Sequence, residues 1–306
     1  MKVVLAGATG FIGNKLVEIL LQEGHSIVLL SRNPDKVKTR FGTSVTAFQR
    51  DACSRGDWFA SMDGADAVIN LVGESIAGKR WDEIQKELLR SSRINATRVI
   101  VQAIEASSVR PSVLINASAV GYYGDVPDDT VTENYPASDD FLGTLSELWE
   151  NEALYAEKLN VRVICSRIGI VLGEGGGALE KMILPFKLFA GGPLGSGRQW
   201  FPWIHRDDVI NGILFMLNND RIAGAVNLTA PNPVTMNEFC RTLGKVLHRP
   251  SWMKVPGFAL RIAVGEFAQF LLSGQKAVPE KLLKNGYTFM YPDLEKALRN
   301  ILIKKN

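Results

Sequence analysis

The first 13 residues constrain the fold of this chain more than any other stretch. Residues 2–6 read KVVLA, a short β-branched apolar run that is typical of a strand buried on both faces. The next segment, GATGFIG, places glycines three residues apart at Gly7, Gly10 and Gly13. Apolar residues then recur at helical spacing as far as Gly24. Strand, glycine turn and helix in this order predict an α/β protein.

A glycine turn in this context is typical of a site for the diphosphate of a dinucleotide. One glycine allows the tight turn, another lets backbone amides approach the diphosphate, and the third lets helix and strand pack closely. The helix N-terminus adds N–H donors and a partial positive charge. We therefore expect a Rossmann-type doubly wound parallel sheet; the alternative is the turn of a flavodoxin-like or receiver-like domain. The residues expected against the cofactor are Gly7, Thr9, Gly10, Phe11, Ile12 and Gly13.

The end of the second predicted strand indicates which dinucleotide binds. An acidic residue there bonds the ribose hydroxyls of NAD, whereas an arginine suits the extra phosphate of NADP. This strand ends in Ser31 and Arg32, without Asp or Glu. We expect NADP (NADPH) as the cofactor, the alternative being that Arg32 is a solvated loop residue. A third predicted strand, 45–48, leads to Asp51, near the expected adenine site.

Composition narrows the class of partner. The chain has 306 residues, 46% of them hydrophobic, and a net charge of +3, which is too weak to imply nucleic acid or a membrane surface. Three widely spaced cysteines predict neither a disulfide framework nor a metal site. The N-terminus is itself the first strand, so we expect no signal peptide, and the apolar stretches are too short to span a bilayer. We expect a soluble, cytoplasmic protein.

The spacing GxxGxxG, rather than GxGxxG, resembles that of short-chain dehydrogenase/reductases, and TGFIG resembles their extended, epimerase-like branch. Over its whole length the chain resembles an atypical subgroup of that branch, the uncharacterised "epimerase family" of bacterial proteins, which also has a eukaryotic relative. The resemblance implies NADP binding and names no substrate. Its markers are GATGFIG, NLVGE, GGGAL, LPF, GSGRQWFPWIH and GYTFMYPDL, the last of which resembles a C-terminal domain of unknown function.

The same resemblance implies further site residues. Leu71, Val72 and Gly73 resemble a small-residue turn that packs against the cofactor. Arg93 resembles a position that reaches the cofactor, although a helix-surface arginine is the alternative. Residues 167–171, ending at Val171, resemble a stretch beside the substrate and cofactor.

The resemblance also implies a hydroxyl at the end of the strand 113–116, followed by a Tyr-Gly pair. Ser118, Tyr122 and Tyr123 are therefore the catalytic candidates, and Ser118 also adjoins the cofactor site. Counting back from Tyr123 places the usual hydroxyl position on Ala119, whereas counting back from Tyr122 places it on Ser118. Both registers stay open.

The usual acid–base pair of this superfamily, Tyr-x-x-x-Lys, is missing. None of the six tyrosines is followed four residues later by lysine. In the predicted helix 141–159 the equivalent positions are Leu145 and Trp149, which cannot exchange protons. Weaker substitutes are the pair Tyr155 and Lys158, and the carboxylates Glu74 and Glu147.

The remaining chain predicts local features. Residues 81–106 should form one amphipathic helix, either straight or bent, and the glycines at 173 and 175–177 predict a lid, a close backbone approach or a plain mobile loop. Asp207 or Asp208 should cap a helix, with His205 structural or beside the substrate, and Thr235 with Glu238 has capping-box spacing. Beyond residue 250 we expect an apolar helix, a short polar helix, and a turn at Gly286 into a strand.

These features predict a cofactor domain, 1–245, with substrate-side insertions at about 173–204, and a mainly helical cap, 246–306. The expected function is that of an NADP-dependent oxidoreductase or a nucleotide-sugar-epimerase-like enzyme with an unknown small-molecule substrate. The alternative is an NADP-binding regulator or sensor without turnover. The segments 81–106 and 141–159 resemble helices that pair in dimers of the superfamily, so a homodimer is possible.

Overall fold

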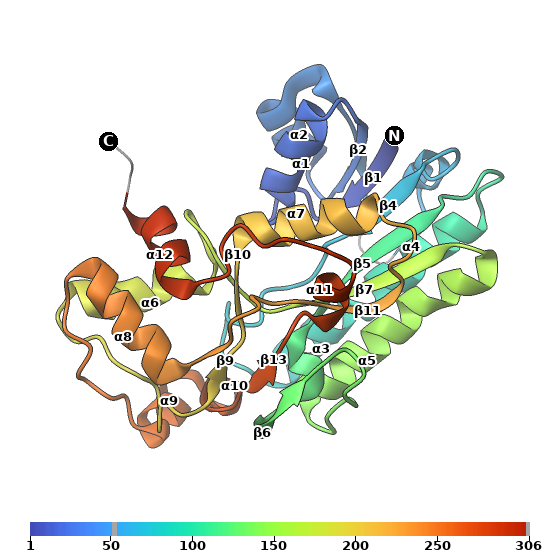
Figure 1. Ribbon diagram of the computed structural model, residues 1–306. Helices are drawn as coiled ribbons and strands as arrows, with labels where there is room; N and C mark the ends of the chain where they lie inside the picture. Colours follow the sequence, from blue (N-terminus) through green and yellow to red (C-terminus); the bar gives the residue numbers. More distant parts are fainter. Residues whose placement is uncertain (51–53, 304–306) are drawn as a thin grey trace.

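A seven-stranded parallel sheet lies at the centre of the computed structural model, which describes residues 1–50 and 54–303 (Figure 1). The strand order is β11-β7-β5-β4-β1-β2-β3. Strands β2 and β3 are added on one side of β1, and β4 and the later strands are added on its other side, parallel to β1. This is the order of a doubly wound sheet and confirms the predicted fold class. Asp51 lies outside the described residues. The strands are β1 (Lys2–Ala6), β2 (Ser26–Ser31), β3 (Val45–Gln49), β4 (Ala67–Asn70), β5 (Val113–Ala119), β7 (Arg162–Ile168) and β11 (Gly224–Leu228).

Alternating side chains of β1 build the two cores of the molecule, because successive residues of a strand point to opposite faces. Val3 and Leu5 pack with α1 (Gly13–Gln22), α2 (Pro34–Phe41) and α7 (Arg206–Leu217). Val4 and Ala6 pack on the other face with α4 (Ile94–Glu105) and α5 (Phe141–Leu154). Helices thus cover both faces, and the carboxyl ends of the strands form the edge at which ligands bind in such sheets.

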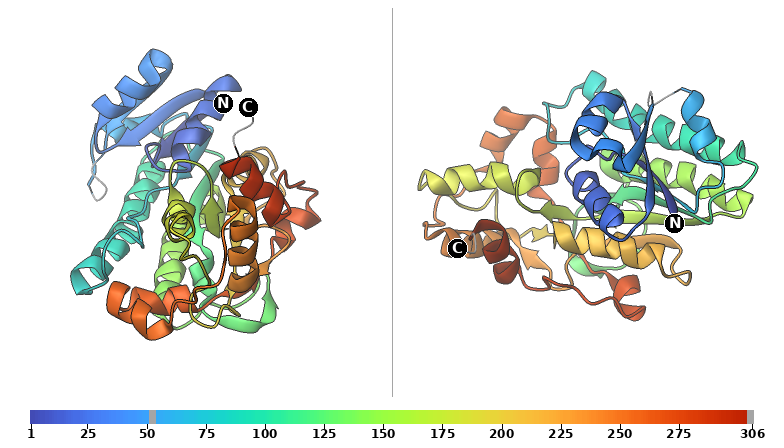
Figure 2. Two further views of the ribbon diagram at one scale, coloured as in Figure 1. Left: turned by 90° about the vertical axis from the view of Figure 1, so that its left-hand side faces the viewer. Right: turned by 90° about the horizontal axis from the view of Figure 1, so that it is seen from above.

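Helices α6 (Gly177–Lys187), α8 (Met236–Leu247), α9 (Gly257–Val264) and α12 (Leu294–Leu302) lie beyond that edge, at the left of Figure 1, and Figure 2 gives two further views of the molecule. Three of them, α6, α8 and α12, share a separate apolar core. The remaining helices are α3 (Glu83–Ser91), α10 (Phe267–Leu272) and α11 (Glu280–Lys284). The short strands are β6 (Val126–Val131), β8 (Ile170–Leu172), β9 (Trp200–Phe201), β10 (Trp203–His205), β12 (Val234–Thr235) and β13 (Gln275–Ala277).

The C-terminal segment packs against elements from the N-terminal half of the chain. Strand β13 pairs with β6, which lies some 150 residues earlier in the chain, in parallel register. Leu282, Tyr287 and Phe289 then join the core beneath the central sheet. Residues on both sides of position 245 therefore complete the same core.

Three local predictions are wrong. Residues 81–106 form two helices, α3 and α4, because the chain breaks at Ser92 and Arg93, where the Ser92 hydroxyl accepts a hydrogen bond from the Glu74 amide. The cap of α7 is His205, whose Nδ1 accepts from the Asp207 amide. Residues after Gly286 form a loop leading into α12, and the strand of this region, β13, precedes the turn.

The capping box of α8, by contrast, is confirmed: the Thr235 hydroxyl and the Glu238 carboxylate bond each other's backbone amides. In the part of the chain that the structure describes, no helix has the length and apolar character needed to cross a membrane.

Candidate functional site

The glycine turn between β1 and α1 has the shape of a diphosphate cradle. Gly7 has φ +91°, and a Cβ there would lie 2.8 Å from the carbonyl carbon of Leu71. A Cβ at Gly13 would collide with the Gly7 carbonyl oxygen, to which the Gly10 amide donates at 3.1 Å. Only glycine fits these positions, because backbone packs directly on backbone.

The start of α1 leaves amide donors for a ligand. The N-cap position is held by Ile12, which has no polar side chain to satisfy the first-turn N–H groups. Thr9 and Gly10 are exposed beside it. At the end of β2, Ser31 is half-buried and exchanges hydrogen bonds with the Asn33 backbone, while Arg32 is exposed. The turn could hold a diphosphate, and the exposed guanidinium of Arg32 could hold the extra phosphate of NADP.

Phe11 explains the glycine run, which the sequence had left open among three interpretations. Added Cβ atoms at Gly173, Gly176 and Gly177 would lie 2.9–3.0 Å from its ring. The guanidinium of Arg206 stands over the same ring at 5.0 Å and bonds the Glu174 carbonyl. The glycines thus allow a close backbone approach that joins the phosphate turn to the start of α6, near Val171.

The turn after β4 lies beside the phosphate turn, as the resemblance implied for Leu71, Val72 and Gly73. Leu71 contacts Gly7, and Leu71 and Val72 are half-buried. Gly73 is exposed at the backbone and lies against the guanidinium of Arg93. The predicted cofactor residues that the structure describes therefore gather at one edge of the sheet, with Phe11 at the boundary to the helical region.

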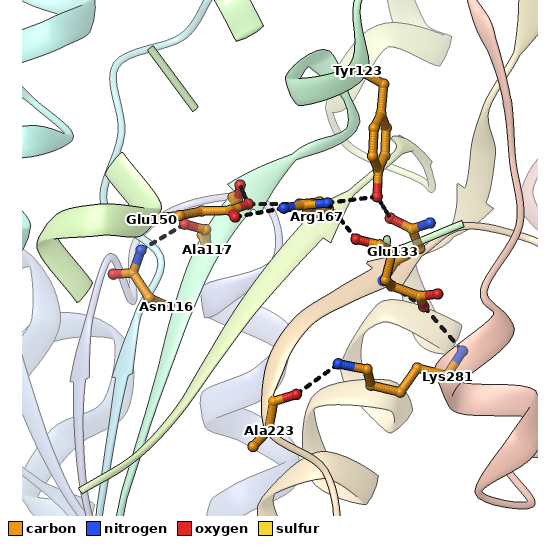
Figure 3. A network of polar contacts seen from close by, with 10 residues as sticks. Asn116, Ala117, Tyr123, Glu133, Glu150, Arg167, Ala223 and Lys281 are labelled. Carbon is orange, nitrogen blue, oxygen red and sulfur yellow. Dashed lines mark hydrogen bonds and ion pairs between the residues drawn. The ribbon is translucent and has the colours of Figure 1, made fainter. Parts of the chain in front are cut away.

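A buried ion pair lies at the end of β5 and β7 (Figure 3). Arg167 donates to both carboxylate oxygens of Glu150 at 2.8 Å, and Ser118 donates to one of them at 2.6 Å. The side chains of the ion pair are at most 7% exposed. Burial alone would lower the pKa of Arg167, but the hydrogen bonds and charge of Glu150 raise it, so the guanidinium stays charged. The hydroxyl of Ser118 is committed to this pair.

The two tyrosines of the predicted site differ in environment. The Tyr123 hydroxyl donates to Asn227 at 2.6 Å and accepts from Arg167 at 2.9 Å, and burial raises the pKa of Tyr123 to about 12. Tyr122 is half-exposed, its ring lies 3.5 Å from the Arg167 guanidinium carbon, and burial raises its pKa. Both phenols are therefore neutral at physiological pH.

The positions equivalent to the usual Tyr-x-x-x-Lys pair are buried. Leu145 is 3% and Trp149 is 4% exposed, and the indole N–H of Trp149 donates to Thr97. The alternative pair, Tyr155 and Lys158, is exposed beside Arg162, at the amino end of β7 and thus at the opposite edge of the sheet. Its members contact each other, and this location is wrong for a pair acting at the candidate site.

The sequence analysis did not predict Glu150. It named Glu147 among the weaker substitutes, and Glu147 is exposed on α5. An available signal was the arginine at the end of an otherwise apolar strand, since a buried guanidinium needs a carboxylate nearby. His205 caps α7, the centre of its ring lies 4.0 Å from that of Tyr291, and burial lowers its pKa. Asp208, predicted as a cap, is buried and accepts from the amides of Met290 and Tyr291.

Comparisons with known proteins agree with this architecture. The model of the NAD-dependent epimerase/dehydratase family matches residues 3–228, and a domain of unknown function, DUF1731, matches residues 255–301. The epimerase family protein YfhF of Bacillus subtilis is 42% identical over 99% of this chain and 98% of its own. A chloroplastic SDR39U1 homologue of Arabidopsis thaliana is 44% identical over 99% of this chain and 87% of its own.

Solved structures give the same result. The crystal structure of human epimerase family protein SDR39U1 with NADPH is 33% identical, covers 98% of this chain and 99% of its own, and has a TM-score of 0.87. MoeE5 in complex with UDP-glucose and NAD is 21% identical, with 98% and 97% covered and a TM-score of 0.78, and thus shares the fold. The chain belongs to the NAD-dependent epimerase/dehydratase family and carries a DUF1731 region at its carboxyl end.

Proposed function

We propose that this protein binds NADP(H) and transfers hydride between it and a small molecule, as an oxidoreductase or an epimerase-like enzyme. The observation that carries the proposal is the cradle of Gly7, Gly10 and Gly13 with Arg32 at the end of the neighbouring strand. The binding of NADPH by the human relative supports the choice of cofactor. When bound, the cofactor supplies or accepts the hydride, while the protein binds, orients and exchanges a proton.

Among the three hydroxyl candidates we favour Tyr122 as the group that exchanges a proton with the substrate. Ser118 donates a hydrogen bond to the Glu150 carboxylate, and the Tyr123 hydroxyl is hydrogen-bonded to both Asn227 and Arg167. Tyr122 is half-exposed, and its raised pKa keeps the phenol protonated and able to donate. The stacked cation of Arg167 would stabilise negative charge that develops beside it.

A second candidate function is an NADP-binding sensor without turnover. Leu145 and Trp149 favour it, because they place apolar side chains where members of the superfamily usually hold the tyrosine and lysine that activate the reaction. Binding of NADPH would then be retained while no hydride left the cofactor.

Arg32→Ala tests the cofactor proposal. Loss of a charge-assisted contact with the extra phosphate should weaken NADPH about 10- to 100-fold and leave NADH nearly unchanged. Isothermal titration of both cofactors measures this. Arg221→Ala, which removes another exposed arginine, is the matched control and should change neither affinity. Equal losses for NADPH and NADH in Arg32→Ala would remove the reason for preferring NADP.

Transfer of deuterium from NADPH labelled at the nicotinamide C4 separates the enzyme from the sensor. Purified protein is incubated with labelled NADPH and a metabolite extract, and the products are analysed by mass spectrometry. An enzyme should label at least one metabolite, and Tyr122→Phe should reduce that labelling while NADPH affinity stays unchanged. Tight NADPH binding without any labelled product would favour the sensor.

A further inference from the structure

A pocket lies beside α8, which Figure 1 shows at the left of the molecule, away from β1 and α1. Its volume is about 290 Å³, at the lower end of the range for small-molecule sites. None of its lining residues is among the predicted cofactor residues or the hydroxyl candidates for catalysis. The lining residues are Pro193, Asn237, Arg241, Ser251, Trp252 and Lys254.

Backbone hydrogen bonds fix the wall of this pocket. The segments 191–195 and 251–255 lie side by side in parallel. The Gly191 carbonyl accepts from the amides of Trp252 and Met253 at 3.0 and 3.1 Å, and a further pair of backbone bonds joins the same segments at 3.0 and 2.8 Å. The side chains that these segments carry are therefore held in place before any ligand arrives.

Two cations line the pocket without a carboxylate. Arg241 of α8 and Lys254 are both exposed, and across residues 1–50 and 54–303 neither has an acidic oxygen within 4.0 Å. No Asp or Glu is among the lining residues. The potential in the pocket is therefore positive, which attracts an anion. The whole stretch 239–265 has no Asp or Glu, and its basic residues are Arg241, Lys245, Arg249, Lys254 and Arg261.

Neutral donors accompany the two cations. Asn237 lies four residues before Arg241 on α8, so the two side chains share a face of the helix. Asn237 and Ser251 are half-buried, and they add an amide and a hydroxyl to the lining. A guanidinium, an ammonium, an amide and a hydroxyl around one small pocket suit the several oxygens of a phosphate.

Trp252 adds a flat apolar surface to the same pocket. Its side chain is 65% exposed, although its indole N–H donates to the Phe189 carbonyl at 3.0 Å. This hydrogen bond fixes the ring and leaves much of it open to solvent. The bases of nucleotides stack on such exposed aromatic rings. Cations and ring together match the two parts of a nucleotide, its phosphate and its base.

We propose that this pocket binds a nucleoside monophosphate, with the phosphate on Arg241 and Lys254 and the base on the ring of Trp252. The small volume suits one nucleotide and is too small for a dinucleotide. The proposal goes beyond the proposed function, because none of these residues belongs to the cradle of Gly7, Gly10 and Gly13.

Three variants test the proposal: Arg241→Gln, Lys254→Gln and Trp252→Leu. Each replaces an exposed side chain, so the unfolding temperature should stay the same. Arg261→Gln is the matched control, because it removes an exposed arginine of the same basic stretch that does not line the pocket. The probes are the 5′-monophosphates of adenosine and uridine, ribose 5-phosphate, which lacks the base, and adenosine, which lacks the phosphate. Isothermal titration is performed with NADPH at saturation, so that the cofactor site is occupied.

At least one of the two monophosphates should bind the NADPH-saturated protein, more tightly than ribose 5-phosphate and adenosine. Arg241→Gln and Lys254→Gln should each weaken its binding about tenfold or more, because a charge-assisted contact is lost. Trp252→Leu should weaken the monophosphate about tenfold and leave ribose 5-phosphate unchanged, because only the base stacks on the ring. Arg261→Gln should behave as the unmodified protein, and NADPH affinity should be the same in all four variants.

Failure of both monophosphates to bind would overturn the proposal, as would binding that Arg241→Gln and Lys254→Gln leave unchanged. Ribose 5-phosphate that binds as tightly as the monophosphates, with no effect of Trp252→Leu, would overturn the assignment of a nucleotide and indicate a phosphate ester without a base. If the unmodified protein fails to bind NADPH, the proposed function fails, and titration of the monophosphates into the variants still tests the pocket by itself.

Discussion

Arg167 and Glu150 form a bidentate ion pair in the interior, with their side chains 4% and 7% exposed. Removing one partner leaves the other charge buried and unpaired, so Arg167→Met should lower the free energy of unfolding by about 3–5 kcal/mol. The double variant Arg167→Met/Glu150→Leu should recover most of this loss, because no uncompensated charge remains. Urea unfolding of the two single variants and the double variant measures the coupling.

The matched control is Lys245→Met, which removes one partner of the solvent-exposed ion pair with Glu295 and should leave the unfolding midpoint nearly unchanged. Equal destabilisation in Arg167→Met and in the double variant would contradict an electrostatic origin. It would mean that the arginine contributes through packing and through its bonds to Tyr123 and Glu133.

Sequence patterns could predict which residues lie at the ends of the strands. They could not predict which side chains from other elements form hydrogen bonds with these residues. The family resemblance predicted Ser118 at a strand end, and Ser118 is the penultimate residue of β5, just before the helical turn that begins at Val120. Its partner Glu150 comes from a helix whose buried face depends on its rotation against the sheet. Glu147 and Glu150 are three residues apart, and packing of the neighbouring Trp149 decides which carboxylate is buried.

The loop 173–177 packs against Phe11 of the phosphate turn, so two elements far apart in the sequence depend on each other. Gly173→Ala would place a Cβ 2.9 Å from the Phe11 ring and 3.0 Å from the Arg206 Cβ. Relief of this crowding should displace the phosphate turn, and we expect NADPH affinity to fall several-fold. Replacing Phe11 by Leu in the same chain should restore part of the affinity, because the smaller side chain makes room.

Titration with NADPH and the unfolding temperature are the two measurements. Gly78→Ala serves as the control, since an added Cβ there meets its nearest neighbour at an ordinary 3.4 Å. An NADPH affinity in Gly173→Ala equal to that of the unmodified protein would show that the loop moves independently of the turn.

Long periodic elements were predictable, and short or interrupted ones were not. The central strands and the helices after β1 and β5 follow from apolar periodicity and turn residues. The break at Arg93 does not, because the apolar pattern of residues 81–106 continues across it while a tertiary hydrogen bond from Glu74 holds the end of α3. Strand β6, VPDDTV, has no alternation and exists because β13 pairs with it.

At the scale of the molecule, the C-terminal segment 275–289 shares the interior of the central sheet. Leu282 is fully buried in the core of the central sheet, the Thr229 hydroxyl bonds the Ala277 carbonyl, and the Tyr287 hydroxyl bonds the Asp208 carbonyl. A fragment of residues 1–245 would expose this core. We expect it to lack a cooperative thermal transition and to bind NADPH poorly.

Calorimetry and NADPH titration of the fragment, beside the full chain, test this expectation. A cooperative transition and full-chain affinity in the fragment would instead establish residues 1–245 as an autonomous domain.

The boundary at residue 245 and the homodimer through α3, α4 and α5 stay predictions. The doubly wound sheet was predictable from the first 13 residues, whereas the return of residues 275–289 was not, because pairing of β13 with β6 leaves no signal in either short segment.

The pairing of β6 with β13 also bears on how the protein is made. The ribosome synthesises the chain from its amino end, so β6 emerges well before β13, the strand that pairs with it. During that interval the apolar residues that later meet Leu282, Tyr287 and Phe289 face solvent or transient partners. The nascent polypeptide therefore stays prone to aggregation until residues 275–289 have been synthesised and can cover this apolar surface.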